Sequence, residues 1–288
     1  MSANDYLIET RLKELSPELH QQVIDTIVTL PRILSLYKNN FPEYTDHTDL
    51  HVLTVINYCN LLIGENVQCL NADELYVLLM SCYLHDVGMG VRPEEFKRYC
   101  EKIDFGDYFD THDREDVSGT IREFHSELSG YFVEKHLVQL LDAPSEAHVY
   151  AIAQTCRGHR RTDLFDEEEF PQSIQLDNGN SICLPYLAAI LRLADEMDVT
   201  SDRNPEILYD ISLIEDERQV FEHKKHRAIK ALDVERDALV LHVETSDQEV
   251  KRGVLEVADK LQKTLDYCVE VVHKRTPYEI TQRQVILC

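Results

Sequence analysis

The residue pair His85-Asp86 ends an otherwise apolar segment, CYLHDVGMG, and Asp195 lies in a second apolar segment, LAAILRLADEMD. An ionised carboxylate buried among apolar side chains destabilises a fold by several kcal/mol unless it is paired or bound to a cation. Two aspartates in this situation therefore predict either two separate cationic partners or one shared metal site.

Three histidines lie in comparable segments: His51 opens HVLTVINY, His125 lies in IREFHSELSGYFV, and His159 ends AIAQTCRGH. Each of them alone is more often a hydrogen-bonded core residue than a metal ligand. Together with the pair and the aspartate above, they place ligand-type side chains on five separate apolar segments, which is hard to explain as coincidence. Neutral imidazole and carboxylate bind Mn, Fe, Co, Ni or Zn, and a carboxylate can bridge two ions.

Apolar spacing and capping signals predict the helices that position these side chains. Asn71 and Glu74 form a capping box ahead of the most apolar helix, which Gly88 is expected to stop. The predicted helices cover residues 17–30, 51–63, 72–86, 120–141, 145–159 and 185–197. The polar stretch 92–119 is expected to be a long loop or lid, with solvated aspartates at 104, 107, 110, 113 and 116, and 163–182 an acidic surface loop.

The pattern changes near residue 204. In IKALDVERDALVLHVET the apolar residues alternate on both sides of Arg236-Asp237, which predicts a β-hairpin, followed by a helix over 246–274 and a last strand in YEITQRQVIL. The basic run FEHKKHRAIK is interpreted as a solvated strand edge or, alternatively, a docking surface for an acidic partner or nucleotide. We expect a mainly α fold, with a helical bundle over 1–203 that includes N-terminal helices within 1–40, and a small α+β appendage over 204–288.

The order His51, His85-Asp86, Asp195 resembles the signature of HD-superfamily phosphohydrolases. LLMSCYLHDVGMG and LRLADEMDVTSDR are similar to the second and closing motifs, and TDHTDLH is similar to the opening motif of HD domains in stand-alone bacterial proteins and beside Hsp90-type ATPases. The resemblance spans roughly residues 41 to 203. It implies an HD-domain bundle in which one metal takes His51, His85, Asp86 and Asp195. A second metal takes His125 and His159, with Asp86 bridging, and His85 and Asp86 are the catalytic pair.

This resemblance implies a phosphohydrolase or phosphodiesterase that hydrolyses a phosphate ester of a nucleotide or related small molecule with water activated by divalent ions (Mn, Fe, Co, Ni, Mg or Zn). Cyclic di-GMP is not predicted as the substrate, because Met89 replaces the lysine of the His-Asp-x-Gly-Lys motif of HD-GYP enzymes. Arg160 also follows His159 where those enzymes have a second histidine, and the GYP tripeptide is absent. Two alternatives stay open: a mixed-valent di-iron oxygenase and a catalytically idle binding or sensor module.

Five side chains near the predicted ligands are candidates for substrate binding: His47, Arg157, Arg160, Arg161 and Arg192. The first three arginines could grip phosphate oxygens, because guanidinium pairs bidentately with phosphate. A solvated patch balancing the acidic DLFDEEE is an equally good interpretation. Arg192, one turn before Asp195, is expected to pair with that aspartate or with substrate. Asp198 is expected to be a cap or an ion-pair partner.

Composition limits the classes of partner. Hydrophobic residues make up 43% and charged residues 28%, and no apolar run approaches the ~18 residues that span a bilayer. The N-terminus lacks a secretory signal, so a cytoplasmic location is expected. A net charge of −24 argues against nucleic acid or anionic membrane as a partner, but allows a small phosphorylated substrate and an oligomer. The eight cysteines contain no C-x-x-C pair and are expected to be reduced core thiols.

Overall fold

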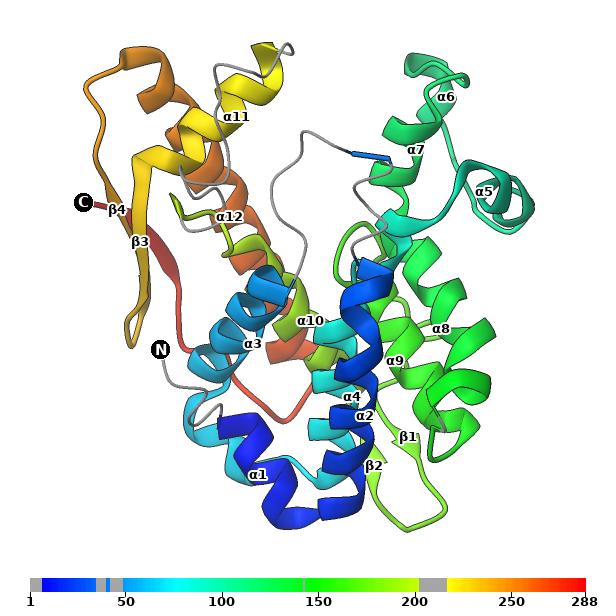
Figure 1. The fold of residues 1–288 in the computed structure, drawn as a ribbon. Helices are drawn as coiled ribbons and strands as arrows, with labels where there is room; N and C mark the ends of the chain where they lie inside the picture. Colours follow the sequence, from blue (N-terminus) through cyan, green and yellow to red (C-terminus); the bar gives the residue numbers. More distant parts are fainter. Residues whose placement is uncertain (1–6, 35–39, 42–48, 142, 202–216) are drawn as a thin grey trace.

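The computed structural model describes residues 7–34, 40–41, 49–141, 143–201 and 217–288. Within these residues the chain is mainly helical, as the sequence predicts, with twelve α-helices and two small sheets. Figure 1 shows the helical bundle in the lower and central part of the molecule, with the C-terminal elements on one side and three short helices projecting on the other.

The bundle is arranged around α4 (Ala72–Leu84), in which every residue except Ala72 and Tyr83 is buried. The predicted capping box is present: the Asn71 side chain accepts hydrogen bonds from the backbone N–H groups of Asp73 and Glu74. The helices that pack on α4 are α1 (Leu7–Leu15), α2 (Pro17–Leu34), α3 (Asp49–Ile63), α9 (Glu146–Gly158) and α10 (Leu184–Glu196). The predicted helices over 51–63, 145–159 and 185–197 are confirmed, and so is the helix predicted over 72–86, although α4 ends at Leu84.

Two other helices differ from their predicted bounds. The helix that begins at Pro17 continues beyond residue 30 to Leu34. The helix predicted over 120–141 is divided at Phe124, whose φ of −109° and ψ of 17° leave the helical conformation, into α7 (Val117–Glu123) and α8 (His125–Leu141). His125 is therefore the first residue of a helix, and α8 packs against α9.

Gly88 has a different role from the helix stop that the sequence predicted. α4 already ends at Leu84, and Gly88 lies in the following 3-10 helix, η3 (Val87–Gly90). A Cβ atom at this position would lie 2.2 Å from the carbonyl oxygen of His125 and 2.7 Å from the backbone nitrogen of Ser129. Glycine is therefore needed because η3 touches the first turn of α8, where the Gly88 N–H donates to Ser129 Oγ (2.9 Å).

Residues 92–119 are not the long loop that their polar composition predicted. They contain α5 (Pro93–Tyr99) and α6 (Tyr108–Thr111) and lead into α7, and we call residues 93–123 the arm (Figure 1). The five aspartates are exposed, as expected. The arm packs on the rest of the protein through a small hydrophobic cluster to which it contributes Phe96, Ile103 and Ile121; the other members are Phe41, Met89, Val91, Phe124 and Leu128. Helices this short are stabilised by tertiary contacts, which a search for apolar periodicity does not detect.

The C-terminal elements follow the predicted order. The hairpin of β3 (Ile229–Val234) and β4 (Ala238–Val243) is confirmed, and the long helix α12 (Gln248–Arg275) returns the chain so that β5 (Gln284–Leu287) pairs parallel to β4. The basic run is not a strand edge, because most of it forms α11 (Glu217–Ala228), with His223 buried. The predicted acidic loop 163–182 contains a two-stranded pairing of β1 (Ile174–Gln175) with β2 (Ser181–Ile182).

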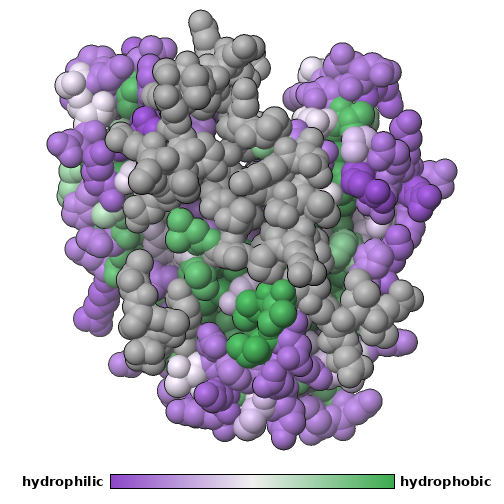
Figure 2. Space-filling model, in the orientation of Figure 1, coloured by the Kyte–Doolittle hydropathy of each residue, from purple (hydrophilic) through white to green (hydrophobic). Residues whose placement is uncertain are grey.

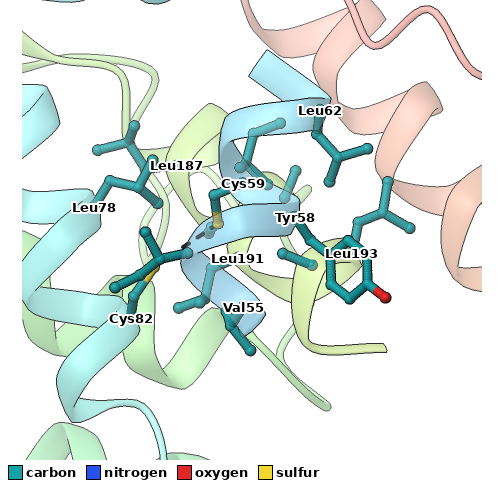
Figure 3. Close-up of a cluster of buried hydrophobic side chains, with 14 of the residues drawn as sticks. Val55, Tyr58, Cys59, Leu62, Leu78, Cys82, Leu187, Leu191 and Leu193 are labelled. Carbon is teal, nitrogen blue, oxygen red and sulfur yellow. Dashed lines mark hydrogen bonds between the residues drawn. The ribbon is translucent and has the colours of Figure 1, made fainter. Parts of the chain in front are cut away.

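One large hydrophobic core joins the bundle to the C-terminal elements, since a single cluster includes Ile8, Leu191, Leu265 and Ile280. Figure 3 shows the part of this core around Cys59, with side chains from α3, α4 and α10 facing one another. Both sides of residue 203 contribute to the cluster. The division into a catalytic domain and an appendage at that residue stays a prediction.

All eight cysteines are free, as expected. The expectation that they lie in the core is confirmed for Cys59, Cys82, Cys156, Cys183 and Cys268. It is wrong for Cys69 and Cys288, which are exposed, and for Cys100, which is half-buried. The Sγ atoms of Cys59 and Cys82 are 3.8 Å apart, which is a contact between thiols and not a disulfide (Figure 3).

The described surface in Figure 2 is largely hydrophilic, with hydrophobic side chains gathered toward the centre of the face in view. Among the described residues, no helix has both the length and the apolar character needed to cross a membrane.

Candidate metal centre

The six residues that the sequence singled out as metal ligands come together at the ends of five helices. All except Asp195 are at most 5% exposed, and the Asp195 side chain is 10% exposed. His51 lies in the first turn of α3, His85 caps the C-terminus of α4 and precedes Asp86, His125 opens α8, His159 caps the C-terminus of α9, and Asp195 lies in the last turn of α10.

One group of three, the first triad, consists of His51, His85 and Asp195. The Nε2 atoms of the two histidines are 3.1 Å apart, and Asp195 Oδ1 lies 3.4 Å from His51 Nε2 and 3.7 Å from His85 Nε2. The ligand atoms of the triad all lie within 4.8 Å of one another, so the three side chains could hold one ion.

The second triad consists of Asp86, His125 and His159. His125 Nε2 lies 3.0 Å from His159 Nε2 and 3.2 Å from Asp86 Oδ1, and His159 Nε2 lies 3.8 Å from the same oxygen. The other carboxylate oxygen of Asp86 faces the first triad, 3.4 Å from His51 Nε2 and 3.5 Å from His85 Nε2. Asp86 therefore stands between the two triads, in the bridging position that the resemblance implies.

The hydrogen bonds around the four histidines fix which ring nitrogen carries the proton. In each ring Nδ1 faces an oxygen acceptor, so Nδ1 donates and a neutral ring presents the lone pair of Nε2 to the centre. The acceptors are Asp198 Oδ2 for His51 (2.6 Å) and the carbonyl oxygens of Cys82 for His85 (2.8 Å), Arg122 for His125 (2.5 Å) and Cys156 for His159 (2.5 Å).

This arrangement fits bound metal. Two Nε2 lone pairs that face each other at 3.0–3.1 Å repel unless a cation or a shared proton lies between them, and the centre contains two such pairs. Imidazole nitrogens and carboxylates are the donor set of Mn, Fe, Co, Ni and Zn. Orientation of each histidine through its other ring nitrogen is the usual arrangement in metal sites.

The electrostatics keep ligand atoms available. Burial lowers the pKa of His159 well below its ordinary value, and the neighbouring His125 and His85 lower it further, so this ring stays neutral. Burial acts to raise the pKa of Asp195, but the hydrogen bond and charge that a protonated His85 supplies outweigh it and hold that pKa well below the ordinary range; a bound cation would take the place of that proton. Asp195 is therefore a carboxylate at neutral pH, ready to bind a cation.

The three arginines that flank His159 in sequence have different surroundings. The Arg157 guanidinium is held by Glu127 (3.3 Å) and Glu134 (2.8 Å). Arg161 pairs with Glu123 (2.7 Å) and lies over the ring of Phe124. Arg160 extends toward the centre, its guanidinium 3.9 Å from Asp195 Oδ2, with a side chain that is 34% exposed. Of the three, Arg160 has the position from which a metal-bound anion could be reached.

The remaining candidates are placed as follows. Arg192 donates to the carbonyl oxygens of Gly158 (2.6 Å) and Thr162 (2.5 Å), so its partners are backbone groups beside His159. His47 lies outside the described residues. Asp198 is the ion-pair partner that the sequence suggested, but its role as the group that orients His51 was not foreseen. The approach of Asp198 to His51 depends on how α10 packs against α3, which spacing alone does not give.

Comparison with known proteins places the chain in a family. No curated protein and no solved structure shows a significant match to it. The HD-CE family matches residues 41–278, a range that contains all six ligand-type residues and extends through α12. Because this match covers well over half of the chain, and because the buried histidines and aspartates agree with an HD metal site, the protein belongs to the HD-CE family of HD domains.

Proposed function

We propose that the protein is a metal-dependent phosphohydrolase or phosphodiesterase that hydrolyses a phosphate ester of a nucleotide or a related small molecule. The observation that carries the proposal is the position of Asp86, whose two carboxylate oxygens face two separate triads of ligand-type side chains. Two adjacent ions held this way suit phosphate ester hydrolysis, because such a pair can act on both the attacking and the leaving oxygen.

Asp86, the four histidines and Arg160 would have different roles in this reaction. When bound, divalent ions would supply the Lewis acidity that lowers the pKa of water and offsets the charge of a phosphate. Asp86 holds the two positions at a fixed separation, and the Nδ1 hydrogen bonds keep the four Nε2 atoms directed inward. Arg160 would bind a non-bridging phosphate oxygen at the partly exposed side of Asp195.

Replacing Asp86 by alanine tests the proposal directly. The Asp86→Ala variant should lose bound metal, measured by elemental analysis, and should lose phosphate or nucleotide release in a screen of nucleotides, cyclic dinucleotides and simple phosphoesters. The matched control is Asp259→Ala, because Asp259 is an exposed aspartate of α12 paired only with Lys263 among the partners that the structure gives. Full phosphatase activity in a metal-free Asp86→Ala protein would refute the proposal.

The same preparation separates hydrolysis from the oxygenase alternative. Hydrolysis predicts product release with Mn or Mg and no consumption of dioxygen. Tightly bound iron, dioxygen consumption on substrate addition and no hydrolysis would refute the proposed function in favour of an oxygenase.

A further inference from the structure

The two triads differ in how one ligand, His125, is held by the rest of the protein. In the first triad, His51, His85 and Asp195 sit on α3, α4 and α10, and the neighbouring residues Val52, Leu84 and Ala194 belong to the large core. In the second triad, Asp86 precedes Val87 of the large core and His159 caps α9, whose buried residues also belong to that core, whereas His125 is flanked by the small cluster of the arm. Met89 follows Asp86 by three residues, and Phe124 and Leu128 stand on either side of His125.

The arm also controls the orientation of His125. The carbonyl oxygen that accepts the Nδ1 hydrogen of His125 belongs to Arg122, in the last turn of α7 and therefore in the arm. For His85 and His159 the corresponding acceptors, Cys82 and Cys156, lie in the same core helices, α4 and α9, as the histidines that they orient. Displacement of the arm would thus release one ligand of the second triad and none of the first.

The arm is a part of the fold that can open at low cost. Its helices contain seven, four and seven residues. Its cluster has eight buried hydrophobic residues, whereas the large core extends from Ile8 to Ile280. Segments with few buried apolar contacts open locally at a free energy below that of global unfolding. The ligands of the second triad are nearly inaccessible, with side chains 0–7% exposed, and opening of the arm would give an ion held there a way out beside His125.

From these observations we propose that the second triad, Asp86, His125 and His159, is an exchangeable metal site gated by opening of the arm, and that the first triad is a permanent one. The inference rests on the metal centre of the proposed function, and it is independent of the substrate. By thermodynamic reciprocity, an ion that binds only when the arm is closed must also hold the arm closed.

Metal release into a chromogenic chelator tests the gate. The full chain loaded with two equivalents of Zn²⁺ should release them in two phases, and His125→Ala should lack the fast phase and keep the slow one. Phe105→Ala removes a half-buried ring whose centroid lies 4.9 Å from that of Phe124. It should accelerate the fast phase about tenfold, which corresponds to about 1.4 kcal/mol of closing free energy, and leave the slow phase unchanged. Ile103→Val, a milder change in the same cluster, should accelerate it less.

Phe221→Ala is the matched control, because Phe221 is a half-buried phenylalanine packed on the large core. It should change neither phase. Hydrogen exchange supplies a second readout: amides of residues 93–123 should become protected when the second equivalent is added and not when the first is. Three results would refute the gated second site: a single release phase, loss of the slow phase in His125→Ala, or equal responses to Phe105→Ala and Phe221→Ala. None of them would refute the proposed hydrolase activity. Failure to bind any metal would overturn both.

Discussion

His51 is oriented by a carboxylate, and the other three histidines are oriented by backbone carbonyls. Asp198 lies 2.6 Å from His51 Nδ1 and is 2% exposed, so its charge acts on the ring with little screening by solvent. A carboxylate in this position makes the imidazole a better donor to a metal. A substitution at Asp198 can therefore change how strongly His51 binds a metal without removing any ligand of the first triad.

Asp198→Asn should weaken metal binding at the first triad by roughly 10- to 100-fold while leaving the fold and the second triad intact. Equilibrium titration with a competing chelator measures this change. Asp233→Asn is the matched control, since Asp233 is an exposed aspartate of β3 that pairs with a histidine outside the centre, His242, at 2.9 Å. An unchanged affinity in Asp198→Asn would mean that the carboxylate has no part in metal binding.

Arg160 is expected to contact substrate and not metal. Arg160→Ala should keep two bound ions and lower kcat/KM by roughly 10- to 100-fold, the loss that follows when a hydrogen bond to a charged group is removed. Arg161→Ala should lower it less, because Glu123 already neutralises Arg161. Steady-state kinetics on the metal-loaded variants checks this, and a larger loss for Arg161 than for Arg160 would contradict the assignment.

The sequence allowed the site to be predicted at the scale of single residues because burial of a charge is costly. His85-Asp86 and Asp195 stand in segments too apolar to tolerate an unpaired carboxylate, and this argument needs no knowledge of the fold. The partners of Arg192 could not be predicted in the same way. They are carbonyl groups of residues 158 and 162, and any backbone can offer a carbonyl.

At the scale of elements, the contact between η3 and α8 sets the distance between Asp86 and His125. Gly88→Ala would place a methyl group against the His125 carbonyl and the Ser129 backbone, neither of which is a flexible side chain that can turn aside. The variant should therefore bind one equivalent of metal in place of two, as measured by elemental analysis and titration. Gly179→Ala is a useful contrast, because its Cβ meets nothing within 4 Å and its φ of +88° strains only the turn between β1 and β2. Retention of two equivalents in Gly88→Ala would contradict this account.

Elements with a long apolar stripe were predictable, and short or charged ones were not. The stripe that helical spacing predicts for α12 is Val250, Val254, Val257, Leu261 and Leu265, and all of it is buried except Val257, which is half-buried. α5 and α6 were missed because helices of seven and four residues show too few turns for a period to appear. α11 was taken for a strand edge because its basic residues conceal the few positions that contact the core, such as Phe221 and Ala228.

At the scale of the whole molecule, the net charge of −24 repels the anionic substrate that is proposed. Long-range repulsion of this kind is screened by salt over about 10 Å, whereas the attraction of bound ions acts at contact. The fold class could be predicted because composition, apolar spacing and helix-capping residues can be read along the entire chain. The single core that residues on both sides of 203 share could not be predicted, because it depends on contacts between residues that are distant in sequence.

Long-range contacts of this kind join the C-terminal helix to the segment that follows His159. The buried Arg275, at the end of α12, donates hydrogen bonds to the carbonyl oxygens of Leu164 and Phe170, in the segment that follows His159. These contacts close loops of 111 and 105 residues, and contacts of such long range form late because the entropy of closing them must be met first. We therefore expect the newly folding chain to collapse into a bundle before it can retain metal, so that metal capture is among the last events of its folding.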